Sequence, residues 1–275
     1  MNESISSRIE RVKAGKATKS QKKLLEYFNT VDFRKIIYMS ITELAEDTGV
    51  AEATVLRFCR SLGFNGYQEF KLHLAQDVTS GVKTSGDAEY VSDILEGYQT
   101  ALEKSRKVLT PQILEDTVGL LLSARTVSCC GVGHSYLAAL ELHNRLLKMG
   151  MISFCEKDMH FQNILISSRD ERDVLVIFSV SGGTKDNIEV AEIARSCGMK
   201  IIVITCYDRS PLTRFADVVI STSPMESPEQ AGSMASKIMQ LFVADVICHA
   251  LHLSDKARFD SYIAKGNVAT AKKLV

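Results

Sequence analysis

The chain of 275 residues is long enough for two domains of ordinary size, and its 45% hydrophobic and 24% charged residues are typical of a folded protein rather than a disordered one. Lys and Arg (33) balance Asp and Glu (33), so the net charge neither favours nor excludes a nucleic-acid partner. The first ten residues, MNESISSRIE, lack the apolar core of a signal peptide. The most apolar stretch, Ile238 to Leu253, is interrupted by polar residues and is shorter than the ~20 residues of a membrane span, so we expect no membrane partner.

The cysteines indicate the compartment. None forms a Cys-x-x-Cys pair, and most lie in apolar runs. Buried free thiols are typical of a reducing environment, so we expect a cytoplasmic protein with no metal site and no cofactor. The seven residues are Cys59, Cys129, Cys130, Cys155, Cys197, Cys206 and Cys248.

The first 23 residues are basic, with seven Lys or Arg against Glu3 and Glu10. Such a run attracts the phosphate backbone of DNA, but the solvated face of a helix has the same composition. Both interpretations stay open at this point.

Residues 40 to 62 predict two short helices around a glycine turn. Ser40-Ile-Thr-Glu43 fits a capping box, and Gly49 fits the left-handed turn that ends the first helix. In the second helix, Glu52 to Leu62, apolar residues recur at helical spacing and predict one buried face, made of Val55, Phe58, Cys59 and Leu62. Two such helices form a helix-turn-helix unit, whose second helix enters the major groove of DNA.

The opposite face of the second helix is the predicted DNA-binding face, formed by Ala53, Thr54, Arg57, Arg60 and Ser61. We assign Arg57 to base reading because a guanidinium group can bind guanine O6 and N7 together. Thr54 and Arg60 could contact bases or phosphates. A helical dimerisation or adaptor domain would show the same apolar periodicity.

The stretch Glu52 to Lys71 resembles the recognition region of the RpiR family of transcription regulators. The small Ala45, the turn Gly49 and the β-branched Val55 match the helix-turn-helix pattern, and a Gly-Phe-Asn-Gly-Tyr segment follows. The turn glycine, the polar outer face and this resemblance together favour DNA binding over the adaptor alternative. Ala51 departs from the family, which usually has a Ser there, so the second helix lacks a cap worth roughly 1 kcal/mol.

Composition divides the chain into a helix-turn-helix domain (1–77), a Gly, Ser and Thr-rich linker (78–90) and a second domain (91–275). Two helices are expected first, about Val91 to Val108 and then from Thr110-Pro111 to about Ser123. Short β-branched strands then alternate with helices, which predicts a doubly wound parallel sheet covered on both faces. The expected strands are Val127–Cys130, Met151–Cys155, Val174–Phe178, Ile201–Thr205 and Val218–Ile220.

Two of these strands end in loops of glycines and hydroxyl residues. Gly131-Val-Gly-His-Ser135 follows the first strand and matches neither a dinucleotide fingerprint nor a P-loop. Ser179-Val-Ser-Gly-Gly-Thr184 follows the third strand and precedes a helix. Hydroxyls, backbone N–H groups and a positive helix end together make a phosphate site without a cation, at the sheet edge where ligands bind. Ordinary helix capping remains the alternative, because Ser, Thr and Gly favour helix starts.

Ser-x-Ser-Gly-x-Thr after such a strand resembles the SIS domain, a flavodoxin-like phosphosugar-binding fold. The stretches Gly131 to Ser135 and Ile204 to Leu212 also match, and the resemblance spans roughly Thr117 to Leu253. It implies that hydroxyls and close backbone approach bind a phosphosugar. The hydroxyls are those of Ser135, Ser179, Ser181 and Thr184, and the close approach is at Gly133, Gly182 and Gly183.

These features predict a transcriptional regulator of carbohydrate metabolism whose operator affinity is modulated by a phosphorylated sugar. Palindromic operators need two-fold symmetric proteins, so we expect a homodimer or homotetramer. The last predicted helix, Ser233 to Leu251, offers apolar side chains to the core or to a subunit contact: Ile238, Leu241, Phe242 and Val246.

The alternative is an aldose–ketose phosphosugar isomerase, which needs a positioned base; the sequence offers His160, Asp186 and Glu226. An isomerase has no use for a helix-turn-helix, so we expect no enzyme. A scaffold for protein partners has no sequence feature in its favour.

Overall fold

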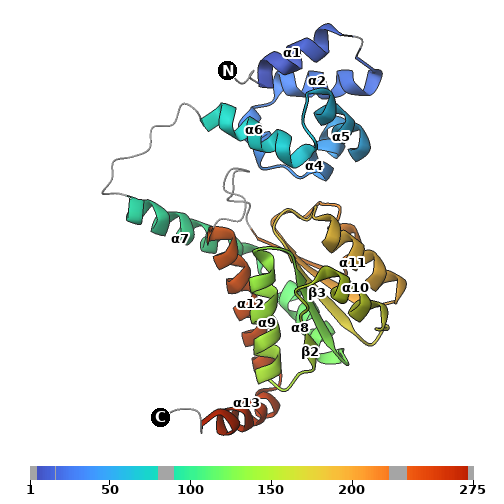
Figure 1. Ribbon diagram of the computed structural model, residues 1–275. Helices are drawn as coiled ribbons and strands as arrows, with labels where there is room; N and C mark the ends of the chain where they lie inside the picture. Colours follow the sequence, from blue (N-terminus) through green and yellow to red (C-terminus); the bar gives the residue numbers. More distant parts are fainter. Residues whose placement is uncertain (1–4, 16, 80–89, 223–233, 272–275) are drawn as a thin grey trace.

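The computed structural model describes residues 5–15, 17–79, 90–222 and 234–271 (Figure 1). A bundle of short helices forms the N-terminal part, and a parallel sheet covered by helices forms most of the remainder. The bundle confirms the predicted all-α region. Its helices are α1 (Ile5–Ala14), α2 (Lys19–Thr30), α3 (Phe33–Ile37), α4 (Ile41–Thr48), α5 (Glu52–Ser61) and α6 (Tyr67–Thr79).

The helix-turn-helix of α4 and α5 has the expected local structure. The Ser40 hydroxyl accepts a hydrogen bond from the Glu43 N–H, and the Glu43 carboxylate accepts one from the Ser40 N–H, which completes the capping box. Gly49 has φ 61°, a left-handed conformation that a Cβ would disfavour. Ala51 precedes α5 at the N-cap position and makes no side-chain capping hydrogen bond, as its lack of a hydroxyl predicts.

The bundle core buries the stripe predicted on α5. Val55, Phe58, Cys59 and Leu62 are each no more than 1% exposed. Phe58 stacks on Phe28 of α2, with ring centroids 5.6 Å apart. Burying each large apolar side chain stabilises the bundle by about 1.5–3 kcal/mol, so packing fixes the orientation of α5.

The second part is a parallel sheet with strand order β2-β1-β3-β4-β5. This is the predicted doubly wound, flavodoxin-like class. Helices α7 (Tyr90–Val108) and α8 (Pro111–Ser123) precede the sheet. The order reverses between β1 and β3, and a ligand crevice forms at such a point. The strands are β1 (Val127–Gly131), β2 (Ser153–Phe154), β3 (Val174–Ser179), β4 (Lys200–Thr205) and β5 (Val218–Ser221).

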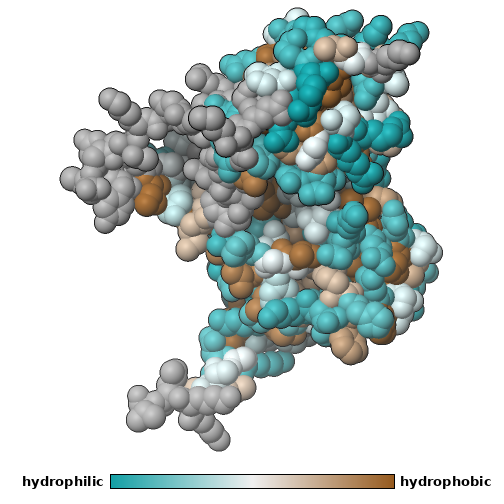
Figure 2. All heavy atoms as spheres, turned by 45° about the horizontal axis from the view of Figure 1, so that its top comes forward, coloured by the Kyte–Doolittle hydropathy of each residue, from teal (hydrophilic) through white to brown (hydrophobic). Residues whose placement is uncertain are grey.

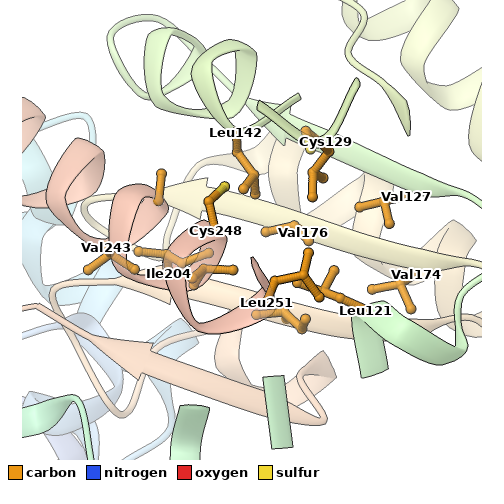
Figure 3. Close-up of a cluster of buried hydrophobic side chains, with 14 of the residues drawn as sticks. Leu121, Val127, Cys129, Leu142, Val174, Val176, Ile204, Val243, Cys248 and Leu251 are labelled. Carbon is orange, nitrogen blue, oxygen red and sulfur yellow. The ribbon is translucent and has the colours of Figure 1, made fainter. Parts of the chain in front are cut away.

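Helices cover both faces of the sheet (Figure 1). One face packs against α8, α9 (Ser135–Lys148) and α12 (Met234–Ser254), and the other against α10 (Met159–Ser167) and α11 (Lys185–Ser196). Figure 3 shows the core under the first face, where Leu142 of α9 and Val243 of α12 point into the same cluster as Val176 of β3.

Two elements differ in length from the prediction. β2 is limited to two residues, because only Ser153 and Phe154 pair with β1. Helix α12 has 21 residues, so it exceeds the predicted stretch and is long and apolar enough to cross a membrane. Its Val243, Ile247 and Leu251 side chains are buried in the domain core, which gives the apolar composition a structural reason.

Helix α13 (Lys256–Ala271) was not predicted. Phe259 is its one buried residue, so its sequence shows little of the periodicity that marks a helix.

Candidate functional site

The loops after β1 and β3 lie side by side at the carboxyl edge of the sheet. Gly131 of β1 pairs in register with Phe178 of β3, so loops 131–135 and 179–184 start from adjacent positions. Neighbouring strands are about 4.8 Å apart. Both predicted loops therefore open at the point where doubly wound sheets bind ligands.

Ser179 ends β3 with an available hydroxyl. The residue is 2% exposed, and its Oγ has no hydrogen-bond partner in the described part of the chain. An unpaired buried hydroxyl costs about 1–3 kcal/mol of stability. A ligand oxygen that forms a hydrogen bond with this hydroxyl would therefore remove that cost, which would strengthen ligand binding.

Gly182 shapes the turn that follows. It has φ 59°, and a Cβ at this position would lie 2.1 Å from Ser210 Oγ, so only glycine fits. The next residue, Gly183, donates its N–H to Ser181 Oγ at 3.2 Å. The Ser181 hydroxyl thus stabilises the turn and keeps its own proton for a further acceptor.

Thr184 is the N-cap of α11. Its side chain makes no capping hydrogen bond, although a Thr at this position commonly accepts one from the first turn. The Thr184 hydroxyl and the first N–H groups of α11 are therefore available to an anion, which the positive end of the helix dipole also favours.

The loop after β1 makes more contacts within the protein. A Cβ at Gly131 would lie 2.6 Å from the Ser135 carbonyl oxygen, and Gly133 has φ 60°. Ser135 begins α9, is 7% exposed, and accepts a hydrogen bond from Gln240 Nε2 at 3.1 Å.

Gln240 is a neighbour of the site that the sequence analysis missed. It lies on α12 and is 2% exposed. Its contact with Ser135 spans 105 positions in the chain, so no local motif marks it. The one available signal was a polar side chain in a mostly apolar helix, and other polar residues of α12 share it.

The predicted DNA-binding side chains lie on the outer face of α5. Ala53, Arg57, Arg60 and Ser61 are exposed, and Thr54 is half-buried. Arg57 Nη2 donates to Thr54 Oγ1 at 3.0 Å, so these two side chains form one polar unit. Because the other face of α5 packs in the bundle core, the polar face belongs to a well-anchored helix.

Two of the basic residues near the N-terminus act within the bundle. Arg8 Nη1 donates to the Leu62 carbonyl at 3.0 Å, and its guanidinium lies 4.9 Å from the Phe64 ring centroid. Lys23 Nζ donates to the Gly49 carbonyl at 3.1 Å. These two cations therefore stabilise contacts within the bundle.

The residues considered for isomerase chemistry occupy ordinary positions. Asp158 caps α10 by accepting from the His160 N–H at 2.8 Å, and the His160 side chain is exposed. Asp186 is exposed in the first turn of α11. Glu226 lies outside the described residues. No group of three or more His, Cys, Asp or Glu side chains in the described ranges could hold a metal ion.

The fold and the two sites define a class, that of DNA-binding proteins with a helix-turn-helix and a ligand-binding α/β domain. The rpiR-family helix-turn-helix domain matches residues 4–81, and the SIS domain matches residues 120–250. An HTH-type transcriptional regulator of Clostridium perfringens is 33% identical over 84% of this chain and 86% of its own length. The HTH-type transcriptional regulator HexR of Pseudomonas aeruginosa is 30% identical over 82% of each chain. The chain therefore belongs to the rpiR family of helix-turn-helix transcriptional regulators.

A solved structure has the same fold. The Vibrio vulnificus NanR protein, complexed with ManNAc-6P, superposes with a TM-score of 0.88 over 98% of this chain and 99% of that one. The two are 23% identical, so the likeness establishes the shared fold.

Proposed function

We propose that this transcriptional regulator changes its affinity for operator DNA when a phosphorylated sugar binds between the loops 131–135 and 179–184. The phosphate would accept hydrogen bonds from Ser179, Ser181 and Thr184 and from the N–H groups at the start of α11. The close approach of the backbone at Gly133, Gly182 and Gly183 would give the phosphate room.

One observation carries this proposal: the Ser179 hydroxyl is buried and unpartnered in the described structure, at the switch point of a sheet whose chain also holds a helix-turn-helix. Helix capping alone would account for the Ser and Thr residues only if their side chains capped α11. Thr184 makes no such bond, so the structure favours the ligand interpretation.

On the DNA side, the face formed by Ala53, Thr54, Arg57, Arg60 and Ser61 would enter the major groove. Arg57 would read a guanine, and the other polar side chains would contact bases or phosphates.

A homodimer or homotetramer would place two such helices on a palindrome. The apolar residues Ile238, Leu241, Phe242 and Val246 of α12 are exposed or half-buried, so they lie outside the core and suit a subunit contact. Hydrophobic side chains are also visible on the surface of the α/β domain (Figure 2). We place this assembly in the cytoplasm, where the described cysteines, none of which is in a disulfide, would stay reduced.

The proposal is tested with purified full-length protein. Selection from a random duplex library should enrich one operator sequence. Glucose 6-phosphate, fructose 6-phosphate and N-acetylmannosamine 6-phosphate are then added during operator titrations. We expect at least one of them to change operator affinity by about 5–150-fold, the usual range of coupling between two sites. The same sugars without phosphate are the controls. No enriched sequence, or no response to the whole panel, would contradict the proposal.

The second candidate is an aldose–ketose phosphosugar isomerase, because the SIS domain is present. We assign no catalytic residue, since the His160 and Asp186 side chains are both exposed. Incubation of the purified protein with each sugar phosphate should give no interconversion above a blank.

A further inference from the structure

We propose that residues 206–214, the linking segment, transmit ligand binding at the loop 179–184 to the helix-turn-helix through Arg209 and Arg214. This inference rests on the proposed function and adds the route by which the two sites are coupled. Coupling needs an element that both sites contact, and the linking segment makes contacts of both kinds.

On one side, the linking segment is bonded to the proposed phosphate loop. The Leu212 N–H donates to the Gly182 carbonyl at 3.0 Å, and the Cys206 N–H donates to the Val180 carbonyl at 3.1 Å. Ser210 Oγ fills the space beside Gly182 where a Cβ would lie only 2.1 Å away. Because backbone hydrogen bonds join the two segments directly, a ligand that shifts Gly182 would also shift the linking segment.

On the other side, the same segment contacts both helices of the helix-turn-helix. The Arg209 carbonyl accepts a hydrogen bond from the Ser40 hydroxyl at the start of α4, and the Arg209 guanidinium pairs with Glu46 at 2.5 Å. Arg214 pairs with Glu52, the first residue of α5, also at 2.5 Å. The two arginines thus contact the helix-turn-helix on both sides of its turn, at Glu46 of α4 and at Glu52 of α5.

A buried contact lies beside these ion pairs. Lys71 of α6 is 2% exposed, and its Nζ donates to the Met39 carbonyl at 3.0 Å and to the Tyr207 hydroxyl at 3.3 Å. The Lys71 Nζ also lies 5.3 Å from the Tyr207 ring centroid. The arginine side chains are more than half exposed, at 55% and 57%. In this proposal the buried lysine contact stays in place during the movement. The exposed ion pairs of Arg209 and Arg214 are the contacts that break or form.

The junction leaves space for such a movement. A groove of about 410 Å³ lies between Arg214 and the start of α5. Ala53, one of the predicted DNA-contacting residues, lines this groove together with Glu52. Because the N-terminal residues of a recognition helix contact base edges, a movement of Arg214 would change the surface that α5 offers to DNA.

The test measures operator affinity with increasing sugar phosphate, using full-length protein and the panel member with the largest effect on the wild type. Two quantities are compared: the midpoint of the sugar-phosphate titration, and the ratio of operator affinities without and with saturating ligand. In Arg209→Ala/Arg214→Ala we expect the midpoint to stay within about twofold of the wild type, while the ratio falls to about one.

A matched control removes two other ion-paired arginines. Arg106 pairs with Glu103 on α7, and Arg172 pairs with Asp170 in the α/β domain. Arg106→Ala/Arg172→Ala should keep the wild-type ratio. As a second arm, Arg209→Glu should lower the ratio and Arg209→Glu/Glu46→Arg should restore it, because the exchange re-forms the ion pair.

The outcomes separate the two proposals. A wild type that does not respond to any sugar phosphate overturns the proposed function and this inference together. A responding wild type with an equal ratio in Arg209→Ala/Arg214→Ala overturns the linking segment alone. The linking segment is also overturned if the affinity ratio falls as far in Arg106→Ala/Arg172→Ala as in Arg209→Ala/Arg214→Ala. It is overturned as well if Arg209→Glu/Glu46→Arg does not restore the ratio.

Discussion

The recognition helix and the loop 179–184 are both proposed to bind phosphate-bearing ligands, but they would do so with different kinds of side chain. Helix α5 offers the exposed cations Arg57 and Arg60, whereas the loop offers neutral hydroxyls such as that of Ser179, which is 2% exposed. Exposed cations suit a polyanion because binding releases condensed counterions. Buried neutral donors suit a single phosphate, since no protein charge has to leave water. The charged side chains therefore indicate the DNA-binding helix but not the loop 179–184.

The largest effect is expected where the loop depends on backbone geometry. Gly182→Val places a side chain in the space of Ser210 at a left-handed φ, so sugar-phosphate binding should fall by at least about 100-fold and the free energy of unfolding by about 2–4 kcal/mol. Calorimetric titration and urea unfolding measure these. Gly119→Ala on α8 is the control, because a Cβ there meets nothing within 4 Å. Retained binding in Gly182→Val would show that the ligand does not use this loop.

The next effect concerns the exposed side of the comparison. Arg57→Ala should weaken operator binding by about 1–3 kcal/mol, since it removes the predicted guanine contact. Its salt dependence should also decrease if Arg57 contacts phosphate. Anisotropy titrations at several salt concentrations measure both quantities, with the exposed Arg106→Ala on α7 as control. An unchanged affinity and footprint would remove Arg57 from the DNA interface.

A smaller effect is expected from a single hydroxyl. Ser179→Ala should lower sugar-phosphate affinity about tenfold, a typical value for one hydrogen bond. Ser128→Ala is a close control, because that hydroxyl is also buried and unpartnered among the described residues but belongs to the interior of β1. Both variants should fold stably. If they bind the sugar phosphate equally well, the Ser179 hydroxyl is not a ligand contact.

The smallest effect comes from the junction between the two regions. Burial lowers the pKa of Lys71 from 10.5 to about 8, so between these values the folded state binds fewer protons than the unfolded state. The contribution of Lys71 to the free energy of unfolding should therefore rise with pH through that window, by roughly 1 kcal/mol per pH unit.

This pH effect must be separated from that of buried thiols. Burial raises the pKa of Cys59 from 9.0 to about 12, so the stability that it contributes is present below pH 9 and is lost as the pH rises from 9 to about 12. The free energy of unfolding is therefore measured from pH 7.5 to 9 for the wild type and for Lys71→Met. The difference between the two proteins at each pH gives the contribution of the lysine. If this difference in the free energy of unfolding does not change with pH, the ammonium group is better solvated than its burial indicates.

Much of the fold was predictable because its signals are local. The capping box at Ser40, the turn at Gly49 and the buried stripe of α5 each depend on residues within one or two helical turns. The strands were recognisable because buried parallel strands are continuous apolar runs. Alternating strands and helices then fix which loops lie at the carboxyl edge, so the Ser179 loop could be placed from sequence.

The remaining features depend on packing between distant residues. Gln240 reaches Ser135 from a different helix, and Arg209 and Arg214 meet α4 and α5 across more than 160 positions in the chain. No periodicity or motif encodes such pairs, because an arginine in a loop has the same local pattern whether or not a partner domain lies beside it.

The most direct test of the central claim follows the operator complex while sugar phosphate is added to the wild type and to Ser179→Ala. If the ligand acts through the loop 179–184, both proteins should reach the same final operator affinity, and Ser179→Ala should need about tenfold more sugar phosphate to reach the midpoint. Identical midpoints in the two titrations would mean that the ligand acts from another place, and they would contradict the assignment of this loop as the sensor.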